Sequence, residues 1–480
     1  MRDGMKPTIA VADTAHPTAS VRWALASLAL SMLLSSLGTN IANVGLPTLA
    51  EVFDATFQQV QWIVLAYLLA ITTLIVSVGR LGDIIGRRRL LLSGIGLFTL
   101  ASALCALAPT LWLLIAARAL QGLGAGSMMA LTMAFVGETV AKEKTGSAMG
   151  LLGTMSAIGT AMGPSLGGML IAGCGWQAIF LISVPLGLLT WLLAYRYLPA
   201  DRQKTKSKRA RFDSLGTLLL ALTLGAYALA MTLGRGSFGQ LNLALLLAAG
   251  FSFALFVFAQ SRVDSPLIQL TLLRDPLLSA SLAMSTLVAT VMMATLVVGP
   301  FYLSQALGLD AVVVGLVLSV GPFVVALTGV PAGHIADRLG AQRMTLAGLI
   351  AMAAGCLALA VLPQTLGIGG YLAPMVVVTL GYALFQTANN TAVMADVAPQ
   401  QRGVISGLLN LSRNLGLITG ASALGAVFAL TSATAEISSA HPEAVASGMR
   451  ITFAVALGLI VTALAVALGS RAITKGHDRS

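Results

Sequence analysis

Long apolar runs fill most of the chain, and short polar clusters or Gly and Pro residues separate them. A helix needs about 20 apolar residues to cross the hydrocarbon core of a bilayer. The runs show no two-residue alternation, so they predict helices rather than barrel strands. Fourteen runs are long enough to span: 22–46, 60–82, 88–108, 111–136, 146–173, 176–198, 214–234, 239–261, 278–305, 311–333, 344–364, 369–390, 403–431 and 449–471.

The composition leads to the same fold class, an all-α integral membrane protein. Hydrophobic residues make up 57% of the 480 residues and charged residues 9%, with a mean hydropathy of +0.91. A soluble domain carries about 25% charged residues. Three cysteines are too few for a secreted disulfide scaffold. The net charge of +11 indicates basic cytoplasmic loops here rather than nucleic-acid binding.

The positions of Lys and Arg predict the orientation. When the N-terminus is placed inside, only Arg235 and Arg450 of the 28 basic residues fall on the outer side. Arg118 and Arg413 fall inside spans, and all others lie on the inner side. This asymmetry predicts an even number of spans in the cell (inner) membrane, with both termini cytoplasmic. Residues 1–20 are polar and resemble a tail rather than a cleavable signal peptide.

An internal repeat predicts two parallel halves. Residues 79–86 read GRLGDIIG and residues 333–340 read GHIADRLG, 254 positions later. A second glycine-rich pair begins at Gly150 and Gly407, 257 positions apart. Each offset is longer than the stretch of chain that six helices need, and the extra residues are enough for two more helices. Parallel repeats are a known plan for transporters. The expected domains are a tail (1–21), a six-helix bundle (22–198), a basic loop (199–213), two inserted helices (214–261), a linker (262–277), a second six-helix bundle (278–471) and a tail (472–480).

Three motifs carry a family resemblance. The loop after the second span reads GRLGDIIGRRR over 79–89, the fourth span contains RALQG over 118–122, and the fifth contains GTAMGPSLGG over 159–168. Together they resemble the major facilitator superfamily, specifically its fourteen-helix drug:proton antiporter branch, over about residues 22–471. Asn43–Pro47, Gln61-Trp62 and Trp176–Phe180 add to the likeness. The resemblance implies two six-helix bundles, two inserted helices and transport by alternating access.

One position departs from the branch. Its multidrug members carry an acidic residue late in the first helix, in a pattern like L-D-x-T-x-x-N. Here the pattern reads LGTNIAN over 37–43, and Gly38 stands where the acid is expected. The residue that couples transport to protons is therefore not identified by the resemblance.

The loop motif predicts a gate. A carboxylate at Asp83 can meet arginines or the positive N-terminus of a helix. The resemblance implies the helix that starts near Gly403, across the interface between the bundles. The alternative is a solvated loop that only sets topology. The gating set is Gly79, Gly82, Asp83, Gly86, Arg87 and Arg88, with Asp337 and Arg338 in the second copy.

The glycines of the fifth span predict close helix packing. Gly159, Gly163, Gly167 and Gly168 have the spacing that lets two helices approach closely, and Pro164 is expected to bend the span. Packing alone and an interface that opens and shuts are both compatible with this pattern. Neither interpretation makes these residues ligands of a substrate.

Two arginines mark a candidate pathway. Arg413 lies about 15 Å along its span, near the midplane, where a charge usually faces a cavity or a partner. Arg118 lies nearer an edge, which favours snorkelling. The structural alternative for both is an arginine bonded to carbonyl groups.

Other polar residues in the spans could complete a substrate or proton pathway. Each of them singly more often forms a hydrogen bond between helices. They are Asn40, Asn43, Tyr67, Gln121, Tyr302, Gln305, Asn410 and Asn414.

The sequence lacks a phosphate-binding loop for ATP, a catalytic constellation and zinc spacing, so no cofactor or metal is expected. We predict a secondary active transporter that exports an organic compound, drug-like or antiseptic-like, by proton antiport. Its partners are a small organic substrate, protons and the bilayer, without nucleic acid, and a monomer is expected. The alternatives are a carrier of an anionic or neutral metabolite, a passive channel or a membrane-embedded enzyme. Without a carboxylate near the midplane, electrostatics favours neutral or anionic substrates over dications.

Overall fold

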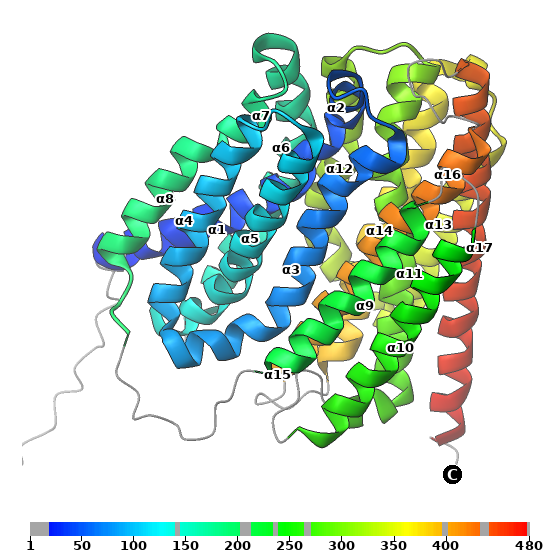
Figure 1. Cartoon of the computed structure of the whole chain (residues 1–480). Helices are drawn as coiled ribbons and strands as arrows, with labels where there is room; N and C mark the ends of the chain where they lie inside the picture. Colours follow the sequence, from blue (N-terminus) through cyan, green and yellow to red (C-terminus); the bar gives the residue numbers. More distant parts are fainter. Residues whose placement is uncertain are drawn as a thin grey trace, which may run out of the picture.

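The computed structural model describes residues 19–139, 145–201, 213–233, 239–263, 270–395, 402–432 and 441–477, which are helices joined by short connections (Figure 1). Within these ranges, fourteen helices are long and apolar enough to cross a membrane. The predicted number of spans and the all-α fold class are therefore confirmed. We call the side where α1 begins and α17 ends the termini side, and the side that carries α2 and α7 the opposite side.

The first bundle forms around α1, which packs against α5, α6 and α8. α3 and α4 complete it through their contacts with α5. The first predicted span ends early at Gly45, because Pro47 opens a separate short helix there. The helices are α1 (Ala19–Val44), α2 (Leu46–Val52), α3 (Phe57–Ile85), α4 (Arg87–Ala106), α5 (Leu111–Thr139), α6 (Thr145–Cys174), α7 (Ala178–Leu181) and α8 (Ser183–Tyr197).

The second bundle forms around α11, which packs against α15 and α17, while α13 and α14 pack together and contact α17 and α12. Two π-helical segments interrupt its spans, η3 after α11 and η5 between α15 and α16. The elements are η2 (Leu270–Arg274), α11 (Pro276–Phe301), η3 (Tyr302–Ala306), α12 (Ala311–Leu339), α13 (Ala341–Val361), η4 (Gln364–Leu366), α14 (Gly367–Ala395), α15 (Arg402–Thr419), η5 (Gly420–Leu424), α16 (Gly425–Thr431) and α17 (Pro442–His477).

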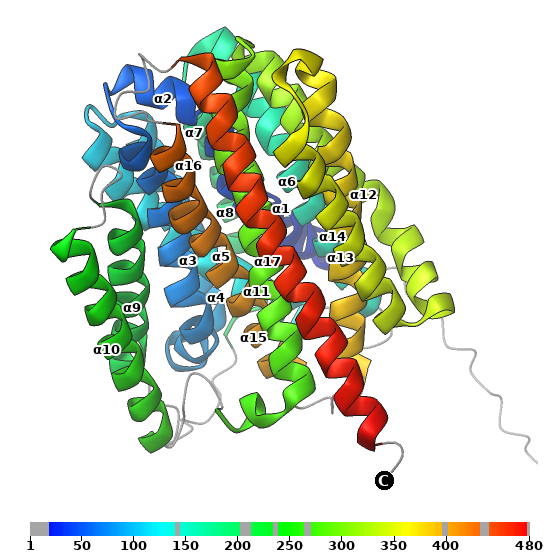
Figure 2. The same ribbon diagram turned by 90° about the vertical axis from the view of Figure 1, so that its right-hand side faces the viewer.

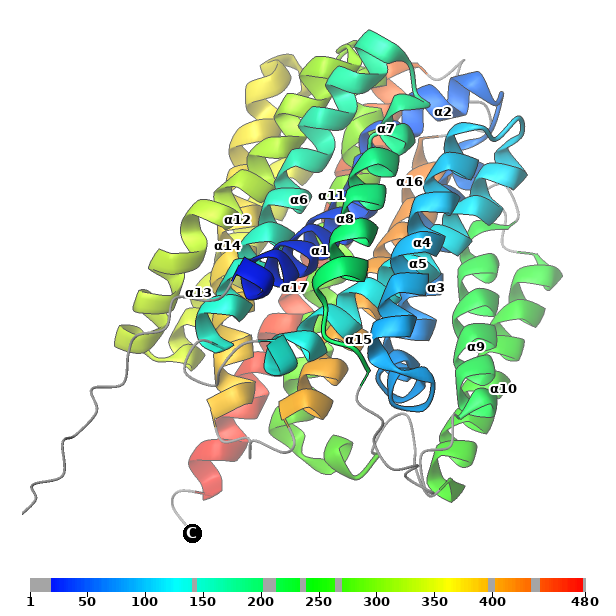
Figure 3. The ribbon, with the colours of Figure 1, turned by 90° about the vertical axis from the view of Figure 1, so that its left-hand side faces the viewer.

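α9 (Ser214–Thr232) and α10 (Gln240–Arg262) form a pair at the edge of the molecule beside α3, as Figures 2 and 3 show from two sides. Trp62 Nε1 of α3 donates to Thr232 Oγ1 at 3.0 Å, and the hydroxyls of Ser77 and Thr217 lie 2.8 Å apart. α9 also contacts η5 of the second bundle. The pair therefore lies against the outer face of both bundles rather than between them.

Several helices begin at a residue that can satisfy the free amide groups of the first turn. Thr56 and Gln59 form a capping box at the start of α3, with Thr56 N donating to Gln59 Oε1 at 2.8 Å. Asp275 Oδ1 accepts from Leu277 N at 2.9 Å at the start of α11, where Pro276 occupies the first turn. Such caps fix where an apolar run becomes helical.

Candidate functional site

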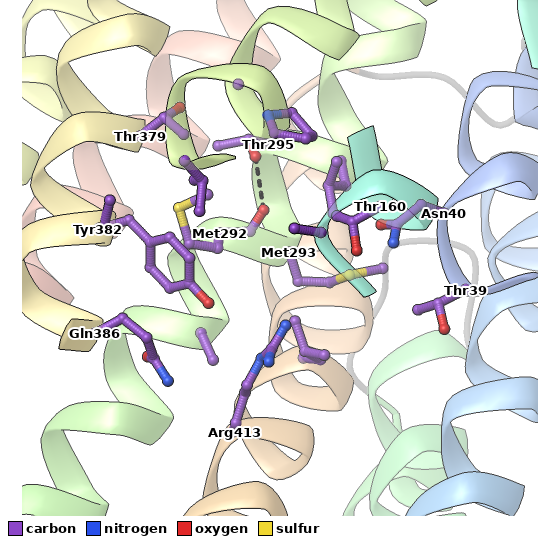
Figure 4. Close-up of a pocket in the computed structure, with 18 of the residues that line it drawn as sticks. Thr39, Asn40, Thr160, Met292, Met293, Thr295, Thr379, Tyr382, Gln386 and Arg413 are labelled. Atoms are coloured by element: carbon purple, nitrogen blue, oxygen red, sulfur yellow. Dashed lines mark hydrogen bonds between the residues drawn. The ribbon is translucent and has the colours of Figure 1, made fainter. Parts of the chain in front are cut away.

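A cavity of about 310 Å³ lies between the two bundles (Figure 4). α1 and α6 of the first bundle line it, together with α11, α12, α14 and α15 of the second bundle. Its volume is at the lower end of the range for small-molecule sites. A cavity lined by both bundles changes shape when the bundles move relative to each other, which is the geometry that alternating access needs.

Arg413 of α15 extends into this cavity. It is the one charged residue among the described residues that line it. Its side chain is exposed to the cavity, and it makes no hydrogen bond or ion pair with any other residue that the structure describes. Arg413 stands eleven residues beyond Arg402, the start of α15, which is about 16 Å along the helix. The cavity therefore has a positive charge at mid-depth.

Uncharged polar side chains surround the remaining space. Tyr382 and Gln386 come from α14, one helical turn apart, and Figure 4 shows both near Arg413. Across the cavity, α1 presents Asn40 and Asn43. Asn43 is 1% exposed, and neither polar atom of its amide has a hydrogen-bond partner among the described residues. A buried amide without a partner is costly, so a ligand that bonded to it would gain affinity.

Arg118 has a different environment, and of its two structural alternatives the structure shows an arginine bonded to carbonyl groups rather than one that snorkels to an edge. Its side chain is 0% exposed. Nε donates to Ile63 O at 3.0 Å, and Nη1 donates to Gly38 O at 3.0 Å and to Gln121 Oε1 at 2.6 Å. The Tyr67 ring covers the guanidinium at 4.1 Å. Arg118 therefore joins α1, α3 and α5 inside the first bundle, and it is not among the residues that line the cavity.

Neighbouring side chains leave little space at Gly38. A Cβ at Gly38 would lie 3.1 Å from Tyr67 Oη and 3.2 Å from the Phe98 ring, which is tighter than most side-chain contacts. The side chains that border the place where the branch carries an acid are those of Tyr67 and Phe98. An acidic side chain would need these neighbours to move.

The other polar residues expected along the pathway do not line the cavity. Tyr67 Oη donates to Ser35 O at 3.0 Å, and Gln121 Nε2 donates to Ser102 Oγ at 2.7 Å, both inside the first bundle. Tyr302 packs its ring 5.8 Å from that of Tyr371 in the second bundle. Gln305, Asn410 and Asn414 are likewise absent from the lining. A role of these residues in transport stays a prediction.

The glycines of α6 pack against α1. A Cβ at Gly159 would lie 2.5 Å from Leu33 O, one at Gly163 would lie 2.9 Å from Asn40 Cβ, and one at Gly167 would lie 2.7 Å from Val44 Cγ1. In the second bundle, Gly416 and Gly420 of the repeated motif lie against Thr286 and Thr290 of α11 in the same way. The helix itself continues through Pro164. The repeat in the sequence thus corresponds to equivalent helix contacts in the two bundles.

The two bundles are in close contact at the opposite side. Gly168 of α6 lies against Ala311 and Gly315 of α12. The Phe57 ring at the start of α3 lies 4.7 Å from that of Phe301 and 5.0 Å from that of Phe428. All these residues lie near the helix ends on the opposite side. This packing separates the cavity from that side of the molecule.

The loop motif between α3 and α4 shows the repeat in its backbone. Gly86 has φ +106° and Gly340 has φ +83°, and they are 254 residues apart, each directly before a helix. Glycine adopts positive φ at little cost. In both halves this glycine turns the chain from one span into the next.

Arg88 is engaged within its own bundle. Its guanidinium donates to Tyr195 O and lies 5.5 Å from the centre of the Tyr195 ring. Asp201 accepts from Arg88 N at 2.8 Å and from Arg89 N at 3.3 Å, so it caps α4. Arg87 and Gly82 lie beside each other in the same loop. The side chains of Asp83, Asp337 and Arg338, and the surroundings of Gly79, lie outside the described residues, so the gate stays a prediction.

The sequence reasoning missed most of the residues that line the cavity from α14. Thr379, Tyr382 and Gln386 follow one another at spacings of three and four residues, which places them on one helix face. They form a stripe of polar residues along one face of this span. That stripe is the signal that could have identified α14 as a helix facing the cavity.

Comparisons with known proteins support this geometry. Residues 28–421 match the family model of the Major Facilitator Superfamily. Riboflavin transporter RibZ of Clostridioides difficile is 30% identical over 402 residues, which cover 84% of this chain and 87% of RibZ. Multidrug resistance protein Stp of Mycobacterium tuberculosis is 33% identical over 412 residues, which cover 84% of this chain and 75% of Stp.

One solved structure has the same fold. It is a bacterial homologue of the human lysosomal transporter Spinster, in an inward-facing and unoccupied conformation. The TM-score is 0.69, with 16% identity over 96% of this chain and 99% of that chain. At this identity the likeness concerns the arrangement of helices alone.

Proposed function

The chain belongs to the major facilitator superfamily, and from this premise we propose that it exports a small organic compound in exchange for protons by alternating access. Members of the family are transporters, so the chain is a secondary transporter and not an enzyme. The observation that carries the proposal is the cavity of about 310 Å³ between the bundles, lined by six helices. A relative named as a multidrug resistance protein supports export of a drug-like or antiseptic-like compound.

The cavity has a lining that suits organic compounds. Apolar side chains such as Met292, Met293 and Leu296 form much of its wall. Methionine is flexible and polarisable, so it adapts to ligands of different shape. Threonine, asparagine, tyrosine and glutamine side chains supply hydrogen bonds at a few places. This combination is typical of sites that orient a mostly apolar molecule through a small number of polar contacts.

A second candidate is a carrier of an anionic or neutral metabolite. It is favoured by the same cavity, because the described residues that line it include Arg413 and no carboxylate. A relative named as a riboflavin transporter is compatible with this alternative. Under this alternative, protons need not take part in each transport cycle.

Reconstitution of the purified protein tests the proposal. Proteoliposomes that contain a pH-sensitive dye are exposed to a panel of cationic, neutral and anionic aromatic compounds under an imposed pH gradient. We expect proton movement only when a transported compound is added, and none in protein-free liposomes. Compound uptake without proton movement supports the metabolite carrier instead. Proton leakage without any compound indicates a channel and contradicts both transport proposals.

A further inference from the structure

We propose that the cavity selects small organic anions, and that Arg413 of α15 with Tyr382 and Gln386 of α14 holds the anionic group. The substrate class is therefore an amphiphilic acid, with one carboxylate or sulfonate group on an apolar or aromatic body. The inference rests on the proposed function only in taking this cavity as the place where the substrate binds.

The first argument is the unpaired charge of Arg413. A guanidinium at the depth of the membrane midplane is costly unless it has a partner or water. Arg118 shows how the same chain places acceptors around a buried arginine. Two backbone carbonyls and Gln121 accept from its Nε and Nη1, although Nη2 has no partner among the described residues. Arg413 has no such acceptors among the described residues, and it extends into the cavity instead. A bound anion is the partner with which the guanidinium of Arg413 forms the strongest hydrogen bonds.

The second argument is that further donors face the same space. Tyr382 and Gln386 are separated by four positions on α14, so they share one helix face. Figure 4 shows Tyr382, Gln386 and Arg413 extending into the same cavity. Both side chains are half-buried, and neither makes a hydrogen bond with a described residue. An acid group placed among them accepts from a planar cation, a hydroxyl and an amide.

The third argument concerns the rest of the ligand. Beyond these donors, the wall of the cavity is formed by apolar side chains, among them Met292, Leu296, Pro322 and Val325. A volume of about 310 Å³ leaves room for a compact aromatic body. Apolar surface of the ligand buried there contributes to binding. A small inorganic anion would leave this apolar space unused.

Cations are disfavoured by the same residues. A lipophilic cation in a low-dielectric cavity needs a carboxylate or an aromatic face. The described lining residues include no Asp or Glu, and Tyr382 is the single aromatic residue among them. A cation bound in this cavity would be repelled by Arg413, which lines the same cavity as Tyr382. The positive charge of the cavity therefore repels cations as well as attracting anions.

Binding to matched compound pairs tests this inference. Each pair is an aromatic carboxylic acid and its primary amide on the same body, and a third compound carries a methylammonium group. Full-length protein is titrated by calorimetry, together with Arg413→Gln, Arg413→Lys and Arg262→Gln. Arg262 is the matched control, because it is exposed on α10 against the Phe258 ring and lies outside the cavity.

Wild-type protein is expected to bind acids about tenfold to a hundredfold tighter than the matched amides, as a charge-assisted hydrogen bond predicts. Arg413→Gln removes this preference, Arg413→Lys keeps most of it, and Arg262→Gln leaves it unchanged. Thermal unfolding of each variant without ligand shows that it is folded.

Three results overturn the inference: amides that bind as tightly as acids, acids that bind Arg413→Gln like wild type, or a panel in which no acid binds. These failures leave export itself untouched if neutral or cationic compounds still drive proton movement in proteoliposomes. Acid binding without any transport would instead overturn the proposed function and leave the anion site standing.

Discussion

Gly168 in α6 and Gly425 in α16 hold equivalent positions, because each brings the motif helix of one bundle against a helix of the other. Gly168 lies against the Ala311 carbonyl of α12, and Gly425 lies against the Gln61 amide of α3. The two glycines are 257 residues apart, which is the offset of the repeated motif. The contacts that close the opposite side therefore occur in a pair related by the repeat. In alternating access, both must separate when the cavity opens to that side.

Gly315→Ala should weaken the closure between α6 and α12. A Cβ on Gly315 would collide with the Pro164 carbonyl, and overpacking of this kind costs about 1–3 kcal/mol. We expect the population to shift toward conformers in which the bundles are farther apart on the opposite side. Spin labels at Gln177 and Leu366, one in each bundle, should report longer distances, and transport should fall.

The control for this prediction is Gly173→Ala. Gly173 belongs to the same helix, α6, but a Cβ there would meet nothing within 4 Å. It should leave both the label distances and transport at wild-type values. If Gly315→Ala also behaves like wild type, the close approach of α6 and α12 does not control closure.

The spans could be predicted from the sequence because hydrophobic length alone decides them. The breaks inside the apolar runs could not be predicted in this way. The run 176–198 divides into α7 and α8 at Ile182, where the chain stays apolar and a hydropathy pattern shows no change. The π-helical segment η5 is similarly hidden, since it lies at Gly420, where α15 packs closely against α11.

Residues of the candidate site could be predicted from the sequence only where a polar side chain interrupts a long apolar run. Arg413, Asn40 and Asn43 stand out in apolar runs, and all three line the cavity. Arg118 stands out equally in the sequence, but it is bonded to backbone carbonyls. The sequence alone does not distinguish an arginine that faces a cavity from one that lies inside a bundle. Tyr382 and Gln386 were missed because the sequence does not show which helices face the cavity.

Arg118→Gln should destabilise the fold without changing the selection of anions. The substitution removes the bonds that the guanidinium donates to the carbonyls of Ile63 and Gly38, and a hydrogen bond from a charged group contributes about 1.5–3 kcal/mol. We expect a lower melting temperature than for Arg413→Gln, which removes no described hydrogen bond. Thermal unfolding in detergent measures both. Equal melting temperatures for Arg118→Gln and wild type would show that the network around Arg118 contributes little.

Asp83→Asn should nearly abolish transport while leaving expression intact, if the loop after α3 acts as a latch. The neutral amide keeps the shape of the side chain but weakens contact with an arginine or a helix N-terminus. Asp201→Asn is the matched control, because an asparagine there can still cap α4 within the first bundle. Transport assays at equal protein level compare the two. Wild-type transport by Asp83→Asn would reduce the motif to a topology signal.

Cys174 offers a test of orientation without engineering. Of the three cysteines, Cys105 and Cys356 are buried and Cys174 is exposed, at the end of α6 on the opposite side. With both termini cytoplasmic, this side faces outward. A membrane-impermeant maleimide added to intact cells should therefore label wild-type protein but not Cys174→Ser. Labelling that requires permeabilised cells would reverse the predicted orientation.

Transport of an acid in its anionic form predicts a specific response to membrane potential. An acid carried as an anion moves one more negative charge than its matched amide, whatever number of protons is exchanged in each cycle. One charge crossing the membrane is worth about 2.3 kcal/mol per 100 mV, which is about fiftyfold in the concentration ratio at equilibrium. Proteoliposomes with a potassium gradient and valinomycin set this potential.

The acid should accumulate on the positive side about fiftyfold more than the amide at 100 mV, because the two compounds differ by that single charge. The effect depends on the charge of the substrate, so it is independent of how the protein inserts into the liposomes. Arg413→Gln should slow the approach to this distribution for the acid, since the anion loses its partner in the cavity, and Arg262→Gln should not. If the concentration ratio of the acid does not change with the potential, the compound crosses in its neutral form. Arg413 would then have no anion to pair with.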